Sequence, residues 1–220
     1  MIKDYIKTFS LAIGAGICIG IGGTVYLMCT SKLLGATLFS VGLLTILVFK
    51  LKLFTGMSGY ILEEKNKLNY ILHLFVSWLG NFVGTFLAGF MLLNTRLSDN
   101  LVLVAENIVQ TKLNDSWYSL IILGIFCGML MFIGVDSFKK LQEKNNFGSI
   151  LIPIICVSTF ILAGFEHCIA DMFYFAVAGF SWQSLLSLLF ITLGNIVGSL
   201  IIPMIKIEHK QEIKNDKSTS

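Results

Sequence analysis

Charged residues are scarce in this sequence. They make up 13% of 220 residues, hydrophobic residues make up 55%, and the mean hydropathy is +0.82. Water-soluble domains carry about 25% charged residues, so this composition excludes an ordinary soluble domain. The net charge of +3 is small, and the charged residues lie mainly between the apolar runs. That distribution indicates membrane topology rather than nucleic-acid binding.

Several motifs are also absent. The five cysteines form no Cys-x-x-Cys pair, so we interpret them as small hydrophobic residues at helix contacts and expect no metal or redox site. There is no nucleotide-binding motif, which favours passive transport, and no cofactor is expected. The first apolar run is too long for a signal peptide and no cleavage site closes it, so we interpret it as a membrane span.

Six apolar segments follow one another, over residues 9–28, 33–61, 70–93, 118–138, 148–178 and 184–205. They are continuous rather than alternating, and about 20 helical residues cross the hydrocarbon core of a bilayer. We therefore predict an all-α membrane protein with six transmembrane helices, forming a single domain over residues 1–205. A polar cytoplasmic tail follows over residues 206–220, and its end is expected to be mobile from Glu208 onward. The polar segment 94–115 is predicted to be a loop.

Two of these segments are longer than one span requires. Segments 33–61 and 148–178 both carry polar residues midway, where a charge facing lipid costs several kcal/mol. We therefore predict two broken helices that line a protein interior. The polar residues are Lys50, Lys52 and Thr55 in the first, and Glu166, His167 and Asp171 in the second.

The chain also repeats itself. The stretch 80–84 (GNFVG) reappears as 194–198 (GNIVG), and each copy follows a polar break by a similar distance, 26 and 28 residues. This pattern predicts a 3+3 inverted repeat, with one copy over about residues 1–93 and the other over about 118–205. The glycines fit close helix packing. Asn81 and Asn195 are expected to bond backbone groups that the breaks set free.

Lysine and arginine are distributed unevenly between the loops. The N-terminus, the second and fourth loops and the tail hold eleven of them, whereas the opposite loops hold three. By the positive-inside rule this places both termini in the cytoplasm.

The strongest local signal is the stretch 164–172 (GFEHCIADM), with three ionisable side chains inside an apolar segment. Such residues indicate a functional site. In a pore, His167 is able to donate a hydrogen bond or a proton to an anion. The structural alternative is a buried histidine satisfied by a neighbour such as Asn195. A membrane enzyme using Glu166 and His167 as acid and base is a further alternative, although no second catalytic cluster or metal-spaced His/Glu set accompanies them.

Three stretches resemble a known family, the formate/nitrite transporters. Gly164–Met172 is similar to the family signature GFEHSxANM, with Cys168 in place of serine and Asp171 in place of asparagine. Leu53–Gly56 (LFTG) is similar to the LFT[GS] motif, and Gly124–Cys127 (GIFC) to the GILCN motif. The resemblance covers all six segments. It implies an aquaporin-like protomer with its own pore, assembled into a homopentamer in the cell inner membrane and surrounded by lipid.

The resemblance also implies roles for single residues. His167 falls on the family's central pore histidine, Thr55 on the threonine that hydrogen-bonds it, and Asn195 on the asparagine of the sixth helix. Apolar constrictions are implied at Phe39, Leu43, Leu53, Phe54, Met131 and Phe160. Lys112 fits a vestibule lysine that attracts anions, and Lys52, Gly128 and Glu166 are expected to affect attraction or selectivity. Without the resemblance, the constriction residues would be interpreted as core and Lys112 as a solvated loop charge.

Two departures from the family pattern bear on selectivity. Gly128 stands where many members have asparagine, and Lys50-Leu51-Lys52 stands where many have a glycine, a small residue and an acidic residue. The positive charge, and the amide lost from the pore wall, argue against formate or nitrite selectivity. Together with Gly128, the stretch Lys50–Met57 (KLKLFTGM) is most similar to the hydrosulfide-channel branch. The structural alternative for both lysines is an ion pair with Glu166 or with loop acids, or extension toward the cytoplasmic face.

The expected function is a passive channel for a small monovalent weak-acid anion, with hydrosulfide first and formate or nitrite next. Helix N-termini at the breaks and His167 are expected to replace the hydration that the anion loses. A proton-coupled formate or nitrite transporter is an alternative. A neutral-solute channel of aquaporin type is a weaker one, because the sequence has no paired Asn-Pro-Ala motifs.

Overall fold

The structure is a computed structural model that describes residues 2–144 and 146–219, with side chains through Glu208. Within these residues all regular secondary structure is helical. The elements are α1 (Ile2–Met28), α2 (Lys32–Val48), α3 (Phe54–Met57), η1 (Ser58–Leu62), α4 (Lys67–Leu93), α5 (Ser98–Leu113), α6 (Trp117–Gln142), α7 (Gly148–Ala163), α8 (Cys168–Ala178) and α9 (Trp182–Thr219).

Four of the helices are long and apolar enough to cross a membrane: α1, α4, α6 and the Trp182–Glu208 part of α9. Helices α7 and α8 reach the same length as a pair, bent by 54° at the segment between them. Helix α2 is apolar but shorter, with 17 residues. The fold is therefore that of a multi-pass membrane protein with four to five apolar spans, and the sixth expected span stays a prediction.

The chain leaves the helical conformation in the middle of two apolar segments. After α2 ends, Lys50 has a φ of 54°, the one positive value outside glycine in the described part of the chain, and Leu53 is extended before α3 begins. Helix α7 ends at Gly164, whose φ of 72° is left-handed and suits glycine, and His167 is extended before α8 begins. Each break frees backbone groups that need partners in an apolar interior.

Asn81 of α4 supplies partners at the first break. Its Oδ1 accepts from the amide of Phe54 at 2.9 Å, and its Nδ2 donates to the carbonyl of Lys52 at 2.9 Å. The same Nδ2 donates to the carbonyl of Ala12 in α1 at 2.8 Å. One buried amide thus joins the break to two spanning helices.

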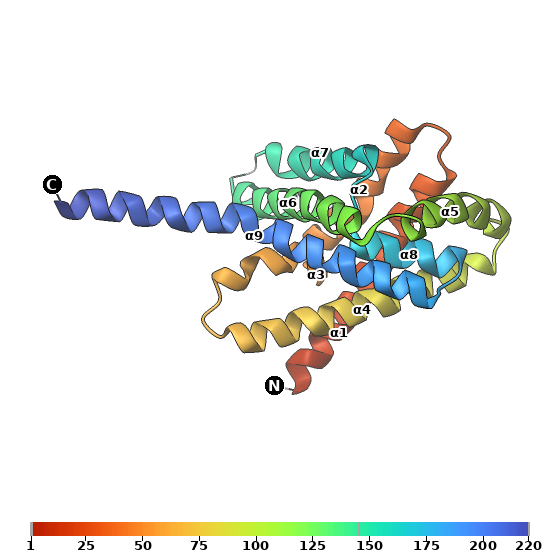
Figure 1. Ribbon diagram of the computed structural model, residues 1–220, viewed down its shortest axis with the longest axis horizontal. Helices are drawn as coiled ribbons and strands as arrows, with labels where there is room; N and C mark the ends of the chain where they lie inside the picture. The colour runs from red at the N-terminus through yellow and green to blue at the C-terminus, as the bar shows by residue number, and fades with distance from the viewer. Residues whose placement is uncertain (1, 145, 220) are drawn as a thin grey trace.

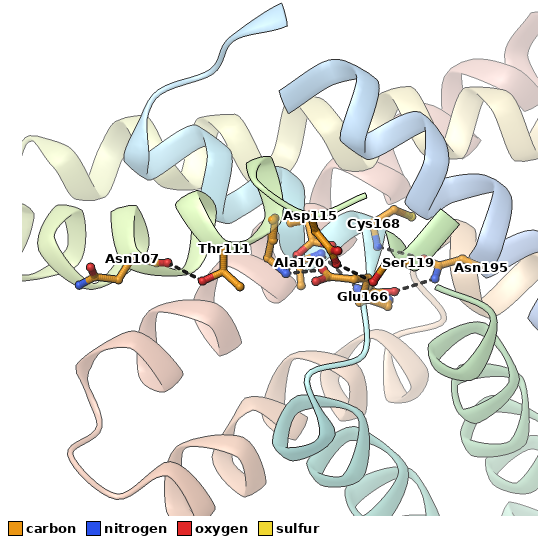
Figure 2. A network of polar contacts seen from close by, with 11 residues as sticks. Asn107, Thr111, Asp115, Ser119, Glu166, Cys168, Ala170 and Asn195 are labelled. Atoms are coloured by element: carbon orange, nitrogen blue, oxygen red, sulfur yellow. Dashed lines mark hydrogen bonds and ion pairs between the residues drawn. The ribbon is translucent and has the colours of Figure 1, made fainter. Parts of the chain in front are cut away.

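Asn195 of α9 does the same at the second break, between α7 and α8 (Figure 2). Its Oδ1 accepts from the amide of Cys168 at 2.9 Å, and its Nδ2 donates to the carbonyls of Glu166 and of Gly124 in α6, both at 2.8 Å. The amide of Asn195 thus bonds backbone groups, and the two ring nitrogens of His167 bond Thr55 and Ala170 instead of Asn195. The expected alternative of an Asn195–His167 bond is therefore wrong.

Glycines let α1 approach α4, and α6 approach α9, to backbone contact. A Cβ on Gly84 would collide with the carbonyl of Ile13, and one on Gly198 with the carbonyl of Ile125. Each collision involves backbone rather than a flexible side chain, so no larger residue fits at either position. The glycines in the two GNxVG stretches therefore pack two helix pairs closely.

One expectation about the polar segments is wrong. Residues 94–115 are not a loop, because α5 occupies most of them and packs against α8. Helix α5 lies at the end of the molecule opposite the C-terminal part of α9 (Figure 1). It brings Lys112 into the interior.

Helix α9 continues into the segment that was expected to be a mobile tail (Figure 1). The side chains beyond Glu208, and Ser220 altogether, lie outside the described residues. An ionic cluster fixes the start of this extension: Asp136 accepts from Lys206 at 2.7 Å, from Lys140 at 2.5 Å and from the Tyr60 hydroxyl at 3.4 Å. It joins α9, α6 and η1 at this end of the molecule.

Candidate functional site

The two helix breaks bring Thr55 and His167 together. Thr55 Oγ1 and His167 Nε2 lie 2.9 Å apart, and the two residues are only 1% and 2% exposed. They are 112 residues apart in the sequence. Thr55 lies in α3, directly after the first break, and His167 lies at the end of the second break, directly before α8. The pair is therefore the point at which the two polar interruptions meet.

The second ring nitrogen fixes the tautomer of His167. His167 is the N-cap of α8, and its Nδ1 accepts from the amide of Ala170 at 3.1 Å. A nitrogen that accepts a hydrogen bond carries no proton, so the neutral ring has its hydrogen on Nε2 and donates it to Thr55 Oγ1. A second proton on Nδ1 would break the cap. Of the two expected roles of His167, hydrogen-bond donation fits this geometry and proton delivery does not.

Aromatic rings cover the imidazole on one side. Phe160 of α7 stacks on the His167 ring at 5.4 Å between centroids, with an interplanar angle of 20°. The edge of Phe39 from α2 meets Phe160 at 6.2 Å. Phe39 and Phe160 are 1% and 3% exposed, so two of the expected constriction residues lie beside the expected central histidine.

A buried ionic cluster lies next to His167. The Nζ of Lys112 contacts Glu166 Oε2 and lies 2.9 Å from Asp171 Oδ1. Burial alone would lower the pKa of Lys112, but the carboxylates of Asp171 and Glu166 outweigh it and raise the pKa above its ordinary value. The lysine therefore stays cationic. Glu166 pairs with this lysine, and the expected ion pair of Lys50 or Lys52 with Glu166 is wrong.

This cluster forms part of the wall of a pocket of about 210 Å³, which Phe160 and His167 also line. A second pocket of about 270 Å³ reaches the residues on both sides of Thr55. The second pocket is lined by Leu43, Ile46, Leu47, Lys50, Leu51, Lys52, Leu53, Gly56, Met57, Val135, Phe138, Lys139 and Gln142. His167 lines the first of these pockets, Leu53 and Gly56 line the second, and the buried Thr55–His167 contact connects the two walls.

The second pocket has three lysines in its wall. No described carboxylate lies within ion-pair distance of Lys50, Lys52 or Lys139. Lys139 lies over the ring of Tyr60, 3.7 Å from its centroid, a cation–π contact that holds the ammonium in place. At the inner end, Leu43 and Leu53 are 1% and 2% exposed. Positive charge therefore surrounds an entrance that narrows onto apolar side chains.

The remaining expected residues lie elsewhere. Phe54 lines a third, apolar pocket of about 420 Å³ between α4 and α9, and Met131 is buried in the core. A Cβ on Gly128 would collide with the backbone of Asn195. Position 128 therefore faces α9 rather than a pore wall, and the glycine serves close packing. The interpretation of Gly128 as a lost amide at the wall is wrong on this geometry.

Sequence reasoning missed the pairing of Lys112 with Asp171 and the place of Lys139 in the second pocket. A signal for the first was present. Leu101, Ala105, Val109 and Lys112 are all buried on α5, and their spacing of three and four residues is that of one helical face. The periodicity of residues 98–113 therefore predicts a helix with Lys112 on its buried face.

This geometry defines a class of protein: a multi-pass helical membrane protein with a buried histidine between two lysine-bearing pockets. The sequence profile of the formate/nitrite transporter family matches residues 2–207, and the chain belongs to that family. It is similar to the formate channel FocA of Haemophilus influenzae, with 27% identity over 88% of this chain and 83% of the relative. A probable formate transporter of Methanothermobacter thermautotrophicus is 27% identical over 77% of this chain and 72% of the relative.

Solved structures share the fold. A pentameric formate channel with formate bound superimposes with a TM-score of 0.82 at 26% identity, covering 95% of this chain and 98% of that one. A second structure, an FNT family ion channel, has a TM-score of 0.76 at 18% identity. These relatives are channels and transporters, so the chain belongs to a family of transporters rather than of enzymes.

Proposed function

We propose that this protein is a passive channel for a small weak-acid anion. The observation that carries the proposal is the buried Thr55–His167 pair between two pockets that each contain lysine. An anion entering the pocket with three lysines meets positive charge first, then apolar side chains, and then a neutral hydrogen-bond donor. This order suits a species that must lose water without meeting a fixed counter-ion that would trap it.

The proposed architecture has six spans, with α2, α3 and η1 forming the second and α7 with α8 the fifth. The two halves form an inverted 3+3 repeat, and the matching hydrogen bonds of Asn81 and Asn195 support it. We propose that the protein lies in the cell inner membrane. The lysine distribution favours a cytoplasmic position for both termini. A homopentamer surrounded by lipid is proposed because a structural relative is a pentameric formate channel.

The proposed mechanism begins with electrostatic collection. Lys50, Lys52 and Lys139 raise the local anion concentration on the cytoplasmic side. Lys112 contributes on the other side, where its charge is offset by two carboxylates. The anion then passes apolar constrictions, formed by Leu43 and Leu53 on one side and by Phe39 and Phe160 on the other.

The constrictions remove water, and burying an unpaired charge is prohibitive unless other groups replace the lost hydration. Helix N-termini were expected to help. The amides of Cys168 and Ala170 at the start of α8 are already bonded to Asn195 and His167, so they are not free for an anion. The replacement falls to the Thr55–His167 pair: the Thr55 hydroxyl accepts from the Nε2–H and keeps its own hydrogen to donate, and the Nε2–H becomes available to an anion that takes the place of Thr55 Oγ1 as its acceptor. A weak acid eases the passage further, because it is able to cross partly in its neutral form.

Formate is the proposed first substrate, because relatives in this family are formate channels. Hydrosulfide stays a prediction that rests on the KLKLFTGM stretch, and nitrite fits the same requirements of size and charge. The contacts of Glu166 and His167 do not support the alternative of a membrane enzyme. Glu166 bonds Lys112 and the His167 ring bonds Thr55, so these two residues do not form a hydrogen-bonded acid–base pair.

The test is flux into proteoliposomes that contain the purified protein, measured by light scattering with formate, nitrite and hydrosulfide salts in turn. We expect at least one of these anions to enter faster than into protein-free vesicles, and His167→Asn to reduce that rate at least about ten-fold, or ~1.4 kcal/mol. Asparagine is a good N-cap residue, so the variant keeps α8 capped while it removes the imidazole. Wild-type flux in His167→Asn would contradict the mechanism, and no flux of any of the three anions would contradict the function.

A further inference from the structure

The cluster beside His167 contains more acid than base. Lys112 is the one ammonium group among the described residues in contact with Glu166 and Asp171. With both carboxylates ionised, the cluster carries one net negative charge in the wall of a pocket through which an anion has to pass. That charge would repel the proposed substrate from the residues that must bind it.

One carboxylate oxygen of the cluster has no hydrogen-bond partner among the described residues. Glu166 Oε2 and Asp171 Oδ1 share the ammonium of Lys112, whereas Asp171 Oδ2 is buried and has no hydrogen-bond partner. Asp171 is 1% exposed and lines the same pocket as His167. An ionised carboxylate oxygen buried without a partner is costly, and a neutral carboxyl group at the same place costs far less.

The surrounding titratable groups do not balance the charge. The thiols of Cys127 and Cys168 and the phenol of Tyr174 interact with Asp171, and the phenol of Tyr26 interacts with Tyr174. Thiols and phenols are neutral when protonated and carry no positive charge. His167 is neutral because its Nδ1 accepts the α8 cap.

The other nearby acid is Asp115, which belongs to a different site. Asp115 accepts from the amide of Ser116 at 2.7 Å and from the hydroxyl of Ser119 at 2.7 Å, and the pocket it lines is a separate one. Figure 2 shows it bonded to Ser119. It offers Asp171 neither a counter-charge nor a partner.

We propose that Asp171 binds a proton on Oδ2 while the channel conducts, so that the cluster formed by Lys112, Glu166 and Asp171 is neutral. The exchange is a simple equilibrium with water in the pocket: the carboxylic acid gives its proton to water and becomes a carboxylate, or takes it back from hydronium. The proposal rests on the proposed channel function, and it adds a site for a proton to the wall of the pocket.

In this state Asp171 acts like an asparagine. Oδ1 accepts from Lys112 as the structure shows, and the hydroxyl on Oδ2 becomes a hydrogen-bond donor next to the pocket, where an amide would place its Nδ2. Loss of the proton replaces that donor with an acceptor and adds a negative charge. Anion flux should therefore stop when Asp171 ionises, whatever happens at His167.

The first experiment compares formate flux in wild type and Asp171→Asn from about pH 5 to about pH 9, a range in which formate itself stays ionised. Since the pH gradient and the substrate affect both proteins alike, the measured quantity is the ratio of the two fluxes. We expect the flux of wild type divided by that of Asp171→Asn to fall about ten-fold per pH unit above the pH at which Asp171 loses its proton. Asp115→Asn should keep the wild-type profile. A ratio that is constant over the whole range would overturn the proposal.

The second experiment detects the proton without transport. Infrared spectra of the purified channel should show the C=O stretch of a buried carboxylic acid at neutral pH. Both Asp171→Asn and Glu166→Gln should remove the band, because one remaining carboxylate balances Lys112. Absence of the band in wild type, or its survival in Asp171→Asn, would contradict the proposal even if no anion is transported. Failure of the proposed function, by contrast, shows as absent flux for all three anions with the band still present.

Discussion

Asn81 and Asn195 make the same set of hydrogen bonds in the two halves of the chain. Each Oδ1 accepts from an amide just after a helix break, and each Nδ2 donates to a carbonyl at the break and to one on a neighbouring spanning helix. The amides of Lys52 and Glu166 follow the same pattern, since they donate to the carbonyls of Leu11 and Leu123. The same pattern of asparagine hydrogen bonds therefore stabilises both breaks.

Replacing either asparagine by alanine should destabilise the fold to a similar extent. Asn81→Ala and Asn195→Ala each leave one amide and one carbonyl at a break without a partner and remove a third bond to a spanning helix, at about 1 kcal/mol or more per bond. We expect a loss of ~2–5 kcal/mol in the free energy of unfolding for each variant, measured by denaturant unfolding in detergent micelles. Asn107→Ala is the matched control, because Asn107 is exposed and its amide bonds only its own helix. If Asn81→Ala were as stable as this control, the bracing role of Asn81 would be disproved.

Substitution of Gly128 should destabilise the protein through packing. A methyl group at this position meets the backbone of Asn195, and overpacking of this kind costs about 1–3 kcal/mol. Gly14→Ala is the control in the same class of helix, since its nearest neighbours are side-chain atoms of Leu51 at 3.6 Å. Because alanine is favoured over glycine in a helix, Gly14→Ala should leave the melting temperature unchanged or raise it. A Gly128→Ala protein that melts no lower than Gly14→Ala would refute the packing role.

Removal of the Thr55 hydroxyl should slow anion flux without unfolding the protein. Thr55→Val keeps the shape of the side chain but leaves the Nε2–H of His167 without its acceptor and the passage without one hydroxyl. We expect at least about a ten-fold loss of flux in proteoliposomes. Thr85→Val removes an equally buried hydroxyl that bonds only the carbonyl of Phe82, and it should conduct normally. Equal rates for the two variants would show that the Thr55 hydroxyl has no part in conduction.

Lys52 and Lys139 of the second pocket should matter most at low salt. Lys52→Gln and Lys139→Gln each remove a positive charge from the pocket wall. Lys139 is exposed and Lys52 half-buried, and charges in contact with solvent are screened over about 10 Å at 0.1 M salt. We expect a several-fold loss of flux at low ionic strength and near-normal flux at high ionic strength. Lys65→Gln, an exposed lysine outside the pocket, is the control. A deficit that does not change with salt would argue against electrostatic collection.

Much of the fold could be predicted from the sequence because membrane spans are long and apolar. The runs that became α1, α4, α6 and α9 are visible by composition alone. The polar interruptions in the other two runs marked the places where the chain leaves the helix, since lipid tolerates neither charge nor unpaired backbone. The asparagines stood out because they repeat at matching distances from those interruptions.

The rest could not be predicted, because it depends on neighbours distant in sequence. The periodicity of residues 98–113 could have placed Lys112 on the buried face of a helix, but its contacts with Glu166 and Asp171 follow only from the packing of α5 against α8. The tautomer of His167 depends on the geometry of one amide three residues along. For Gly128, the resemblance to the family indicated a missing amide side chain, whereas the structure shows that the neighbouring backbone leaves no space for one.

The glycine contacts also limit how this protein is able to move. Where backbone rests on backbone, as between α1 and α4 and between α6 and α9, there is no layer of side chains to slide or change rotamer. We therefore expect each of these two helix pairs to move as one rigid body. If the protein conducts as proposed, we expect opening and closing to involve the interrupted segments next to Thr55 and His167.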